Sequence, residues 1–203
     1  MRVLKQPFAL TCLIIIGGYC GHAAAVSDEL VKSCDACHGT NGVSKNTNIP
    51  SIAGIAEWNL SDQMLQYLDG RPAKTVNHVL GDTSKSGNMK TVVEGLSEDQ
   101  INDLAKYYSS KPFVKAKQTF DGNKAAAGKE VHMASCDKCH SKGGSDPFDE
   151  ASILAGQQKG YILRTMNEYK GGQRQGAKGM VDAIKALSAD DISALVEFYA
   201  SQQ

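Results

Sequence analysis

The chain has 203 residues, with 22 Lys and Arg against 22 Asp and Glu. This balance gives no electrostatic support for a nucleic-acid partner, and only the N-terminal segment is strongly apolar. Residues 26–110 contain 7 basic and 11 acidic side chains, whereas residues 111–203 contain 13 and 11. An acidic half and a mildly basic half are suited to orienting a charged partner.

Residues 1–25 have the pattern of a secretory signal peptide. Basic residues precede an apolar run over residues 8–18, and the alanines that follow predict cleavage after Ala25. A retained anchor or a lipidated Cys20 is the alternative, but Tyr19 beside Cys20 fits a lipoprotein signal poorly. We therefore expect a periplasmic mature chain that begins at Val26 and has no membrane span.

The rest of the chain is an internal repeat. The pentapeptide Cys-Asp-x-Cys-His that begins at Cys34 recurs at Cys136, 102 residues later. The later landmarks Met89 and Met180 are 91 residues apart, so the first copy carries 11 extra residues between Gly70 and Met89. The repeat predicts two domains and a connecting linker, which span residues 26–110, 124–203 and 111–123 respectively.

Each copy is predicted to be all-α with about three helices, because apolar residues recur at spacings of three and four. In the first copy we expect a helix capped by Ser27, a middle helix around Met64, and a closing helix after the capping-box pattern Ser97 to Gln100. The second copy should repeat this order with helices over residues 128–139, around Met166 and after Ser188. Such short helices bury a thin core, which predicts that a bound group completes it.

The two repeated motifs predict covalent haem attachment. In a Cys-x-x-Cys-His motif, both sulfurs form thioethers with the haem vinyl groups, and the following histidine coordinates the iron. The sequence therefore predicts two haem c groups, with His38 and His140 as the proximal iron ligands. The four sulfurs that would attach them belong to Cys34, Cys37, Cys136 and Cys139.

Other uses of these cysteines fit the sequence less well. A thioredoxin-like redox pair is typical of a βαβ context, which this helical pattern lacks. A shared four-cysteine zinc site leaves both histidines unexplained. No Gly-x-Gly-x-x-Gly fingerprint opens a strand, so we expect no flavin on this chain.

Two methionine pairs obey the repeat and are candidates for the second axial position. Met64 and Met166 fall on apolar helix faces, where methionine usually packs in a core. Met89 and Met180 fall in Gly- and Lys-rich segments predicted to be loops, from which a thioether can approach an open haem face. We favour Met89 and Met180. Two axial protein ligands leave no open position, which indicates outer-sphere electron transfer rather than a haem peroxidase.

These motifs resemble the two-haem cytochrome c4 family, including the cytochrome subunit of flavocytochrome c sulfide dehydrogenase. The resemblance covers nearly the whole mature chain. The segments similar to both branches are residues 34–42, residues 50–54 and Met89 before Leu96-Ser97. The segments similar to the flavocytochrome branch are residues 136–144, the acidic residues 146–150, residues 153–157 and residues 198–203.

The resemblance also implies a role for Pro50. Family members often place a proline whose carbonyl orients the proximal histidine, and Pro50 matches this position for His38. The matched position in the second copy is Ser152. The orientation of His140 is therefore left open, with Pro147 as a possible substitute.

The resemblance implies tandem cytochrome c domains that transfer one electron at a time and are not an enzyme by themselves. In the flavocytochrome branch, the cytochrome accepts electrons from a separate flavin-bearing sulfide dehydrogenase subunit. The alternative is a freestanding cytochrome c4-type shuttle that serves another periplasmic redox protein such as a terminal oxidase. A di-haem peroxidase is a third possibility, and it would bind CO or cyanide readily at neutral pH.

Overall fold

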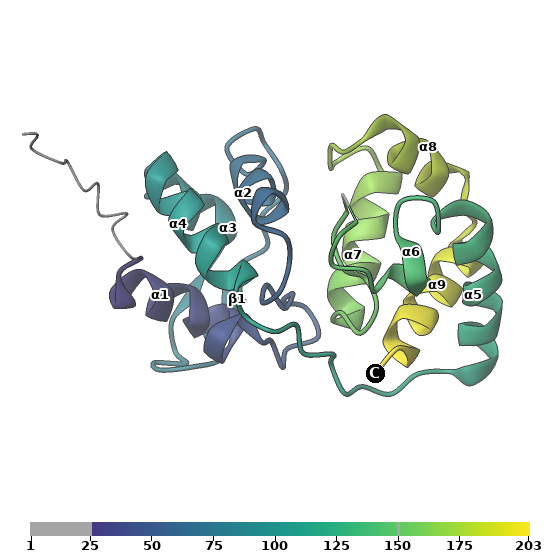
Figure 1. Cartoon of the computed structure of the whole chain (residues 1–203), viewed down its shortest axis with the longest axis horizontal. Coiled ribbons are helices and arrows are strands. Elements are labelled where there is room, and N and C mark those ends of the chain that lie inside the picture. The colour runs from purple at the N-terminus through teal and green to yellow at the C-terminus, as the bar shows by residue number, and fades with distance from the viewer. Residues whose placement is uncertain (1–25, 150) are drawn as a thin grey trace, which may run out of the picture.

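The computed structural model describes residues 26–149 and 151–203, and it is formed by two groups of helices (Figure 1). The predicted signal peptide, residues 1–25, lies outside the described residues. The first group contains α1 (Asp28–His38), the 3-10 turn η1 (Thr40–Gly42), α2 (Glu57–Leu65), β1 (Val76–Asn77), β2 (Ser86–Gly87), α3 (Met89–Glu94) and α4 (Glu98–Ser109). The second contains α5 (Gly122–Ser135), α6 (Ser141–Gly144), α7 (Lys159–Lys170), α8 (Lys178–Ala186) and α9 (Ala189–Ser201).

The helix ends follow the capping signals in the sequence. The Ser27 hydroxyl accepts a hydrogen bond from the Leu30 N–H and starts α1. The predicted capping box of α4 is present, because Ser97 and Gln100 bond each other's backbone N–H groups. Ser188 and Asp191 form the same box at the start of α9. The capping box therefore determines where the closing helix of each copy begins.

The first group encloses a small core. Helices α2 and α4 pack together, and the buried side chains between them come from a few positions. These are Ile55, Leu60, Leu104, Ala105 and Tyr108. The thin core agrees with the expectation that a bound group completes the domain.

The polar insertion of the first copy forms a short antiparallel ribbon. Strand β1 pairs with β2, with Val76 opposite Gly87. The residues that follow β1 contact the cysteine motif, because the Ala36 carbonyl accepts hydrogen bonds from the N–H groups of Val79 and Leu80 at 2.6 and 3.1 Å. The insertion thus covers the segment between the two cysteines of α1.

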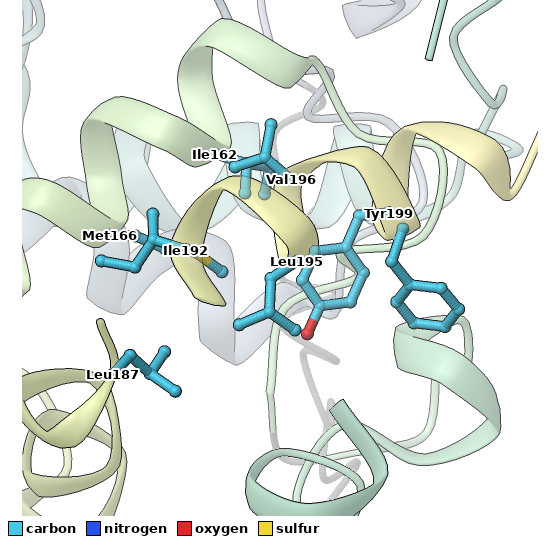
Figure 2. Close-up of a cluster of buried hydrophobic side chains, with 8 residues drawn as sticks. Ile162, Met166, Leu187, Ile192, Leu195, Val196 and Tyr199 are labelled. Carbon is cyan, nitrogen blue, oxygen red and sulfur yellow. The ribbon is translucent and has the colours of Figure 1, made fainter. Parts of the chain in front are cut away.

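The second group has the larger core, which is formed mainly by α7 and α9 (Figure 2). Its buried members are Ile162, Met166, Leu187, Ile192, Leu195, Val196, Phe198 and Tyr199. Helix α5 differs from its expected range of 128–139, since it begins at Gly122 and ends at Ser135. It starts early because the Asp121 carboxylate accepts hydrogen bonds from the N–H groups of Asn123 and Lys124.

Helices α5 and α9 cross at a glycine, and we expect substitution there to be costly. A Cβ at Gly128 would lie 2.1 Å from the Ala194 carbonyl oxygen, so the two helix backbones would have to separate. Gly128→Ala should lower the free energy of unfolding of the haem-loaded protein by about 1 to 3 kcal/mol, measured by chemical denaturation. The control is Gly122→Ala in the same helix, where a Cβ meets nothing within 4 Å. Equal stability of the two variants would contradict the close crossing.

No helix in residues 26–149 or 151–203 combines the length and hydropathy needed to cross a bilayer.

Candidate haem-attachment sites and the domain interface

The first cysteine motif lies on the last turns of α1. His38 is its final residue and is 7% exposed. The Asp35 carboxylate accepts hydrogen bonds from the N–H groups of Asn41 and Gly42, and it lies 2.9 Å from the hydroxyl of Tyr108 on α4. The motif is therefore fixed both to the turn after it and to the closing helix.

The second motif lies beyond the end of α5 rather than within a helix. The His132 carbonyl accepts hydrogen bonds from the N–H groups of both Cys136 and Asp137, which ends the regular helix. The His132 side chain is 1% exposed, and its Nδ1 lies 3.0 Å from the Tyr199 hydroxyl. The structure shows that it anchors the motif to α9, as Tyr108 does on α4.

None of the four cysteines of the two motifs forms a disulfide. Cys34, Cys37 and Cys136 are partly buried, and Cys139 is exposed. Burial raises the pKa of the first three, so these groups are neutral thiols at neutral pH. Neutral thiols that form no disulfide remain available for thioether bonds to vinyl groups.

Both histidines are oriented by a backbone carbonyl that lies twelve residues later. Nδ1 of His38 lies 2.9 Å from the Pro50 carbonyl oxygen, and Nδ1 of His140 lies 3.2 Å from that of Ser152. A carbonyl only accepts, so each Nδ1 carries the proton and Nε2 holds the lone pair. Burial lowers the pKa of both imidazoles, which favours the neutral form that can coordinate a metal.

The second copy therefore needs no proline at this position. The hydrogen bond uses a main-chain oxygen, which Ser152 supplies as well as a proline would. The oxygen that binds Nδ1 of His140 therefore belongs to Ser152 and not to the suggested substitute, Pro147. The orientation left open by the sequence is thus provided by Ser152.

The two methionine pairs occupy different surroundings. Met166 belongs to the buried cluster of the second domain, and Met64 packs at the edge of the first cluster. Met89 and Met180 do not lie in loops as expected, since Met89 begins α3 and Met180 lies in the first turn of α8. Helix α3 starts there because the Asn88 side chain caps it by accepting from the Thr91 N–H.

Haem fits the residues at both motifs. Each motif presents two free thiols and an imidazole whose Nδ1 is already engaged. Among residues 26–149 and 151–203, neither the Nε2 of His38 nor the Nε2 of His140 forms a hydrogen bond, so each is available to coordinate a metal. A bound haem would supply an iron that takes up and releases one electron.

The domain interface includes the two segments whose carbonyl groups orient His38 and His140. The Gln157 side chain is 2% exposed and bridges to Ser51, accepting from its N–H at 2.8 Å and donating to its carbonyl at 2.9 Å. The Ser152 hydroxyl lies 2.6 Å from the Asn59 side-chain oxygen. Because Ser51 follows Pro50, the interface joins the segments that orient His38 and His140.

Further contacts extend this interface along the start of α7. The Thr47 carbonyl accepts from the Tyr161 N–H at 2.8 Å, and the Asn48 carbonyl accepts from the Arg164 guanidinium at 3.1 Å. Gln158 donates to the Ser44 carbonyl at 2.6 Å. The repeat could not reveal these residues, because they differ between the two copies.

Removing the Gln157 bridge should destabilise the interface strongly. Gln157→Leu leaves the buried N–H and C=O of Ser51 without partners, at about 1 to 3 kcal/mol for each group. We expect the haem-loaded variant to unfold at lower denaturant, with separate transitions for the two domains. The control is Gln175→Leu at an exposed position. A single transition at the wild-type midpoint would show that the bridge contributes little.

Comparisons with known proteins place the whole chain among cytochromes. The cytochrome c family model matches residues 25–110. Cytochrome c4 of Azotobacter vinelandii is 30% identical over 209 residues, which cover 94% of this chain and 96% of that protein. The thiosulfate dehydrogenase electron acceptor of Thiomonas intermedia is 29% identical over 190 residues, covering 88% of this chain and 82% of that protein.

A solved structure supports the same fold. The crystal structure of reduced cytochrome c4 from Pseudomonas stutzeri superposes with a TM-score of 0.69 at 24% identity, and the match covers 89% of this chain and 100% of that one. The expected all-α architecture of tandem cytochrome c domains is confirmed by this similarity. Beyond the three helices that the sequence predicted for each domain, the first domain has α3, and the second has α6 and α8.

Proposed function

Because the chain belongs to the cytochrome c4 family of di-haem electron-transfer proteins, we propose that it accepts electrons from a periplasmic dehydrogenase that oxidises an inorganic sulfur compound. The chain carries two haem c groups and is an electron carrier rather than an enzyme. The first candidate donor is a flavin-bearing sulfide dehydrogenase subunit. It is supported by the sequence resemblance of residues 136–144, 153–157 and 198–203 to the flavocytochrome branch.

We assign the haem contacts to the repeated residues. The thioether sulfurs are those of Cys34, Cys37, Cys136 and Cys139, and the axial ligands are His38, Met89, His140 and Met180. We also assign residues 1–25 to export, residues 26–110 and 124–203 to the two domains, and residues 111–123 to the linker between them. The carbonyls of Pro50 and Ser152 hold the proximal imidazoles.

The observation that carries the proposal is the link between the two histidine segments. Gln157 binds the residue after Pro50, and Ser152 itself contacts the first domain through Asn59. These contacts hold the two haem sites as one unit, so an electron that enters one domain has a fixed route to the other. A fixed pair of one-electron sites is suited to a donor that releases electrons in pairs.

A second donor, thiosulfate dehydrogenase, is favoured by a specific similarity. The Thiomonas intermedia relative that matches 88% of this chain is a thiosulfate dehydrogenase electron acceptor. In that case the protein is a freestanding cytochrome c4-type shuttle, and a terminal oxidase is a suitable electron acceptor for it.

Isolation of the untagged protein from its own cells tests these candidates. A flavin-bearing companion that reduces both haems when sulfide is added supports the first. Reduction by a thiosulfate dehydrogenase, with no flavoprotein companion, supports the second. If neither dehydrogenase reduces the haems, the proposal is contradicted.

Reduction by the dehydrogenase should slow as salt rises. The first domain region has 11 acidic against 7 basic side chains, so a partner with a basic surface is attracted to it. Salt screens such attraction beyond about 10 Å at 0.1 M, and we expect the second-order rate constant to fall by about tenfold from low to high salt. Stopped-flow kinetics measures this, with an uncharged chemical reductant as the control. Rates that are independent of ionic strength would indicate apolar docking.

A further inference from the structure

We propose that His132 is a proton-binding site coupled to the second haem, so that its imidazole binds a proton when the second domain accepts an electron. This coupling requires a haem attached at Cys136 and Cys139, but it does not depend on which dehydrogenase delivers the electron. It is a property of the second domain, because the first copy of the repeat has Leu30 at the matched position.

The His132 imidazole is buried between α5 and α9. The residue is 1% exposed, and its ring centroid lies 5.2 Å from that of Phe198 and 5.6 Å from that of Tyr199. Tyr199 belongs to the core cluster of this domain (Figure 2). Burial of a polar ring is costly unless it is hydrogen-bonded, so the partners of its two nitrogens decide which protonation states it can hold.

Both ring nitrogens have a partner that can stabilise a charged imidazole. Nε2 lies 3.3 Å from the Asp137 carboxylate, and Nδ1 lies 3.0 Å from the Tyr199 hydroxyl. A carboxylate only accepts, so Nε2 carries a proton and Nδ1 is the atom that can gain a second one. A hydroxyl both donates and accepts, so Tyr199 can bond to Nδ1 in either state. The Asp137 side chain is 50% exposed and connects the ring to solvent.

The first domain joins the matched tyrosine and aspartate without a histidine. The Tyr108 hydroxyl lies 2.9 Å from the Asp35 carboxylate, which also accepts from two backbone N–H groups of the following turn. Leu30, at the position of His132, is apolar. In the second domain the histidine lies between the tyrosine and the aspartate, and it introduces a base that the first domain lacks at this place.

His132 is linked to the residues that would hold the second haem. Its carbonyl accepts a hydrogen bond from the Cys136 N–H at 2.7 Å. Burial raises the pKa of the Cys136 thiol, and a hydrogen bond from Tyr199 partly offsets this effect, so the phenol that binds Nδ1 also contacts the attaching sulfur. Burial lowers the pKa of His140, and a charge on His132 acts in the same direction. A charge on His132 therefore influences the proximal iron ligand.

Other charged groups on α5 and on the helices packed against it are paired or exposed. They are Lys124, Lys129 and Glu130 on α5, Lys142 on α6, and Asp190, Asp191 and Glu197 on α9. Glu197 and Lys142 are held in ion pairs, Asp191 caps its own helix, and the others are exposed. Among the described residues, Asp137 is therefore the acidic group that contacts the His132 ring.

Electron uptake and proton uptake favour each other because the two charges are opposite. The dehydrogenase delivers one electron to the second domain, which reduces the iron from ferric to ferrous, and His132 takes one proton from solvent at Nδ1. The new covalent bond is this N–H bond, and the net charge of the domain is unchanged. By linkage, the domain binds an electron more tightly at low pH, where His132 is protonated, than at high pH.

Reduction potentials of the haem-loaded protein, measured from about pH 5 to pH 8, test this coupling, because unperturbed histidines titrate in that range. Unit charges about 10 Å apart in a protein shift each other's equilibria by roughly tenfold. We expect the electron affinity of one haem to fall by about tenfold across the range, which is 59 mV for a one-electron couple, and that of the other haem to change less. His132→Leu, which introduces the residue type of Leu30, should remove most of this difference.

His78→Leu is the matched control. It replaces the other histidine of residues 26–149 and 151–203 that lies outside a cysteine motif, at a partly exposed position, and it should leave the pH dependence unchanged. Asp137→Asn keeps His132 but removes the anion that faces it, and its half-exposed position makes it compatible with folding. Loss of that anion disfavours the charged imidazole, so the pH dependence should move to lower pH.

Proton uptake on reduction is a direct second measurement. A pH-indicator dye in weakly buffered solution reports it while a chemical reductant reduces both haems, so the result does not depend on the natural donor. The wild type should take up more protons per chain than His132→Leu. If the pyridine haemochrome assay shows that His132→Leu has lost a haem, Asp137→Asn decides the question. Equal proton uptake by the wild type and a fully loaded His132→Leu would overturn the proposal. A pH-dependent potential that is the same in the wild type and in Asp137→Asn would also overturn it.

Discussion

Met89→Ala and Met180→Ala are each expected to abolish the ferric sulfur-to-iron charge-transfer band of one haem. Each change removes a thioether donor and opens a coordination position, so that haem should also show a lower potential and bind CO. Absorption spectra of the ferric protein report the band. The location of both residues in the first turn of a short helix, α3 or α8, gives each thioether a defined position.

Met64→Ala and Met166→Ala are the matched controls. Both methionines pack against the buried clusters, and Met166 is 7% exposed. These variants should keep the band and lose stability, with a cost of about 2 to 5 kcal/mol for Met166. Loss of the band in Met64→Ala with its retention in Met89→Ala would show that the ligand assignment is wrong. Ready binding of CO by the wild type would instead indicate an open haem, as in a peroxidase.

Replacing both Cys136 and Cys139 with alanine is expected to remove most of the structure of the second domain. Without thioethers the haem is not retained, and helices α5 to α9 lose the group that completes their core. Far-UV circular dichroism should show the loss of helix, while the pyridine haemochrome assay should report one haem per chain. The first domain serves as an internal reference because its own motif is intact.

The single variant Cys139→Ala separates attachment from packing. Cys139 is the exposed cysteine of the pair, so its removal leaves the Cys136 thioether and His140 in place. We expect one thioether to retain the haem and most of the helical structure. Native-like helical content in the double variant, without its second haem, would contradict the dependence of folding on haem.

The sequence by itself determined the features that depend on local chemistry. Covalent haem attachment requires two cysteines and a histidine at fixed spacing, so the motifs that begin at Cys34 and Cys136 can be recognised from the sequence. The closing helices were also predictable, because the boxes at Ser97 and Ser188 act within one turn. The expected boundaries of α5 were wrong, since the cap at Asp121 precedes the apolar pattern on which they were based.

The tertiary structure decided what depends on groups distant in sequence. The acceptor for His140 is a main-chain oxygen, which every residue type carries, so no side-chain pattern could identify Ser152. The bridge from Gln157 to Ser51 spans 106 positions. Arg71 and Arg174, which lie in different domains, both donate a hydrogen bond to the side-chain oxygen of Gln63. These contacts arise between two copies that have diverged at the interface. The sequence of each copy predicts the helices of that copy. The hydrogen bonds between the copies form only when the two domains pack together.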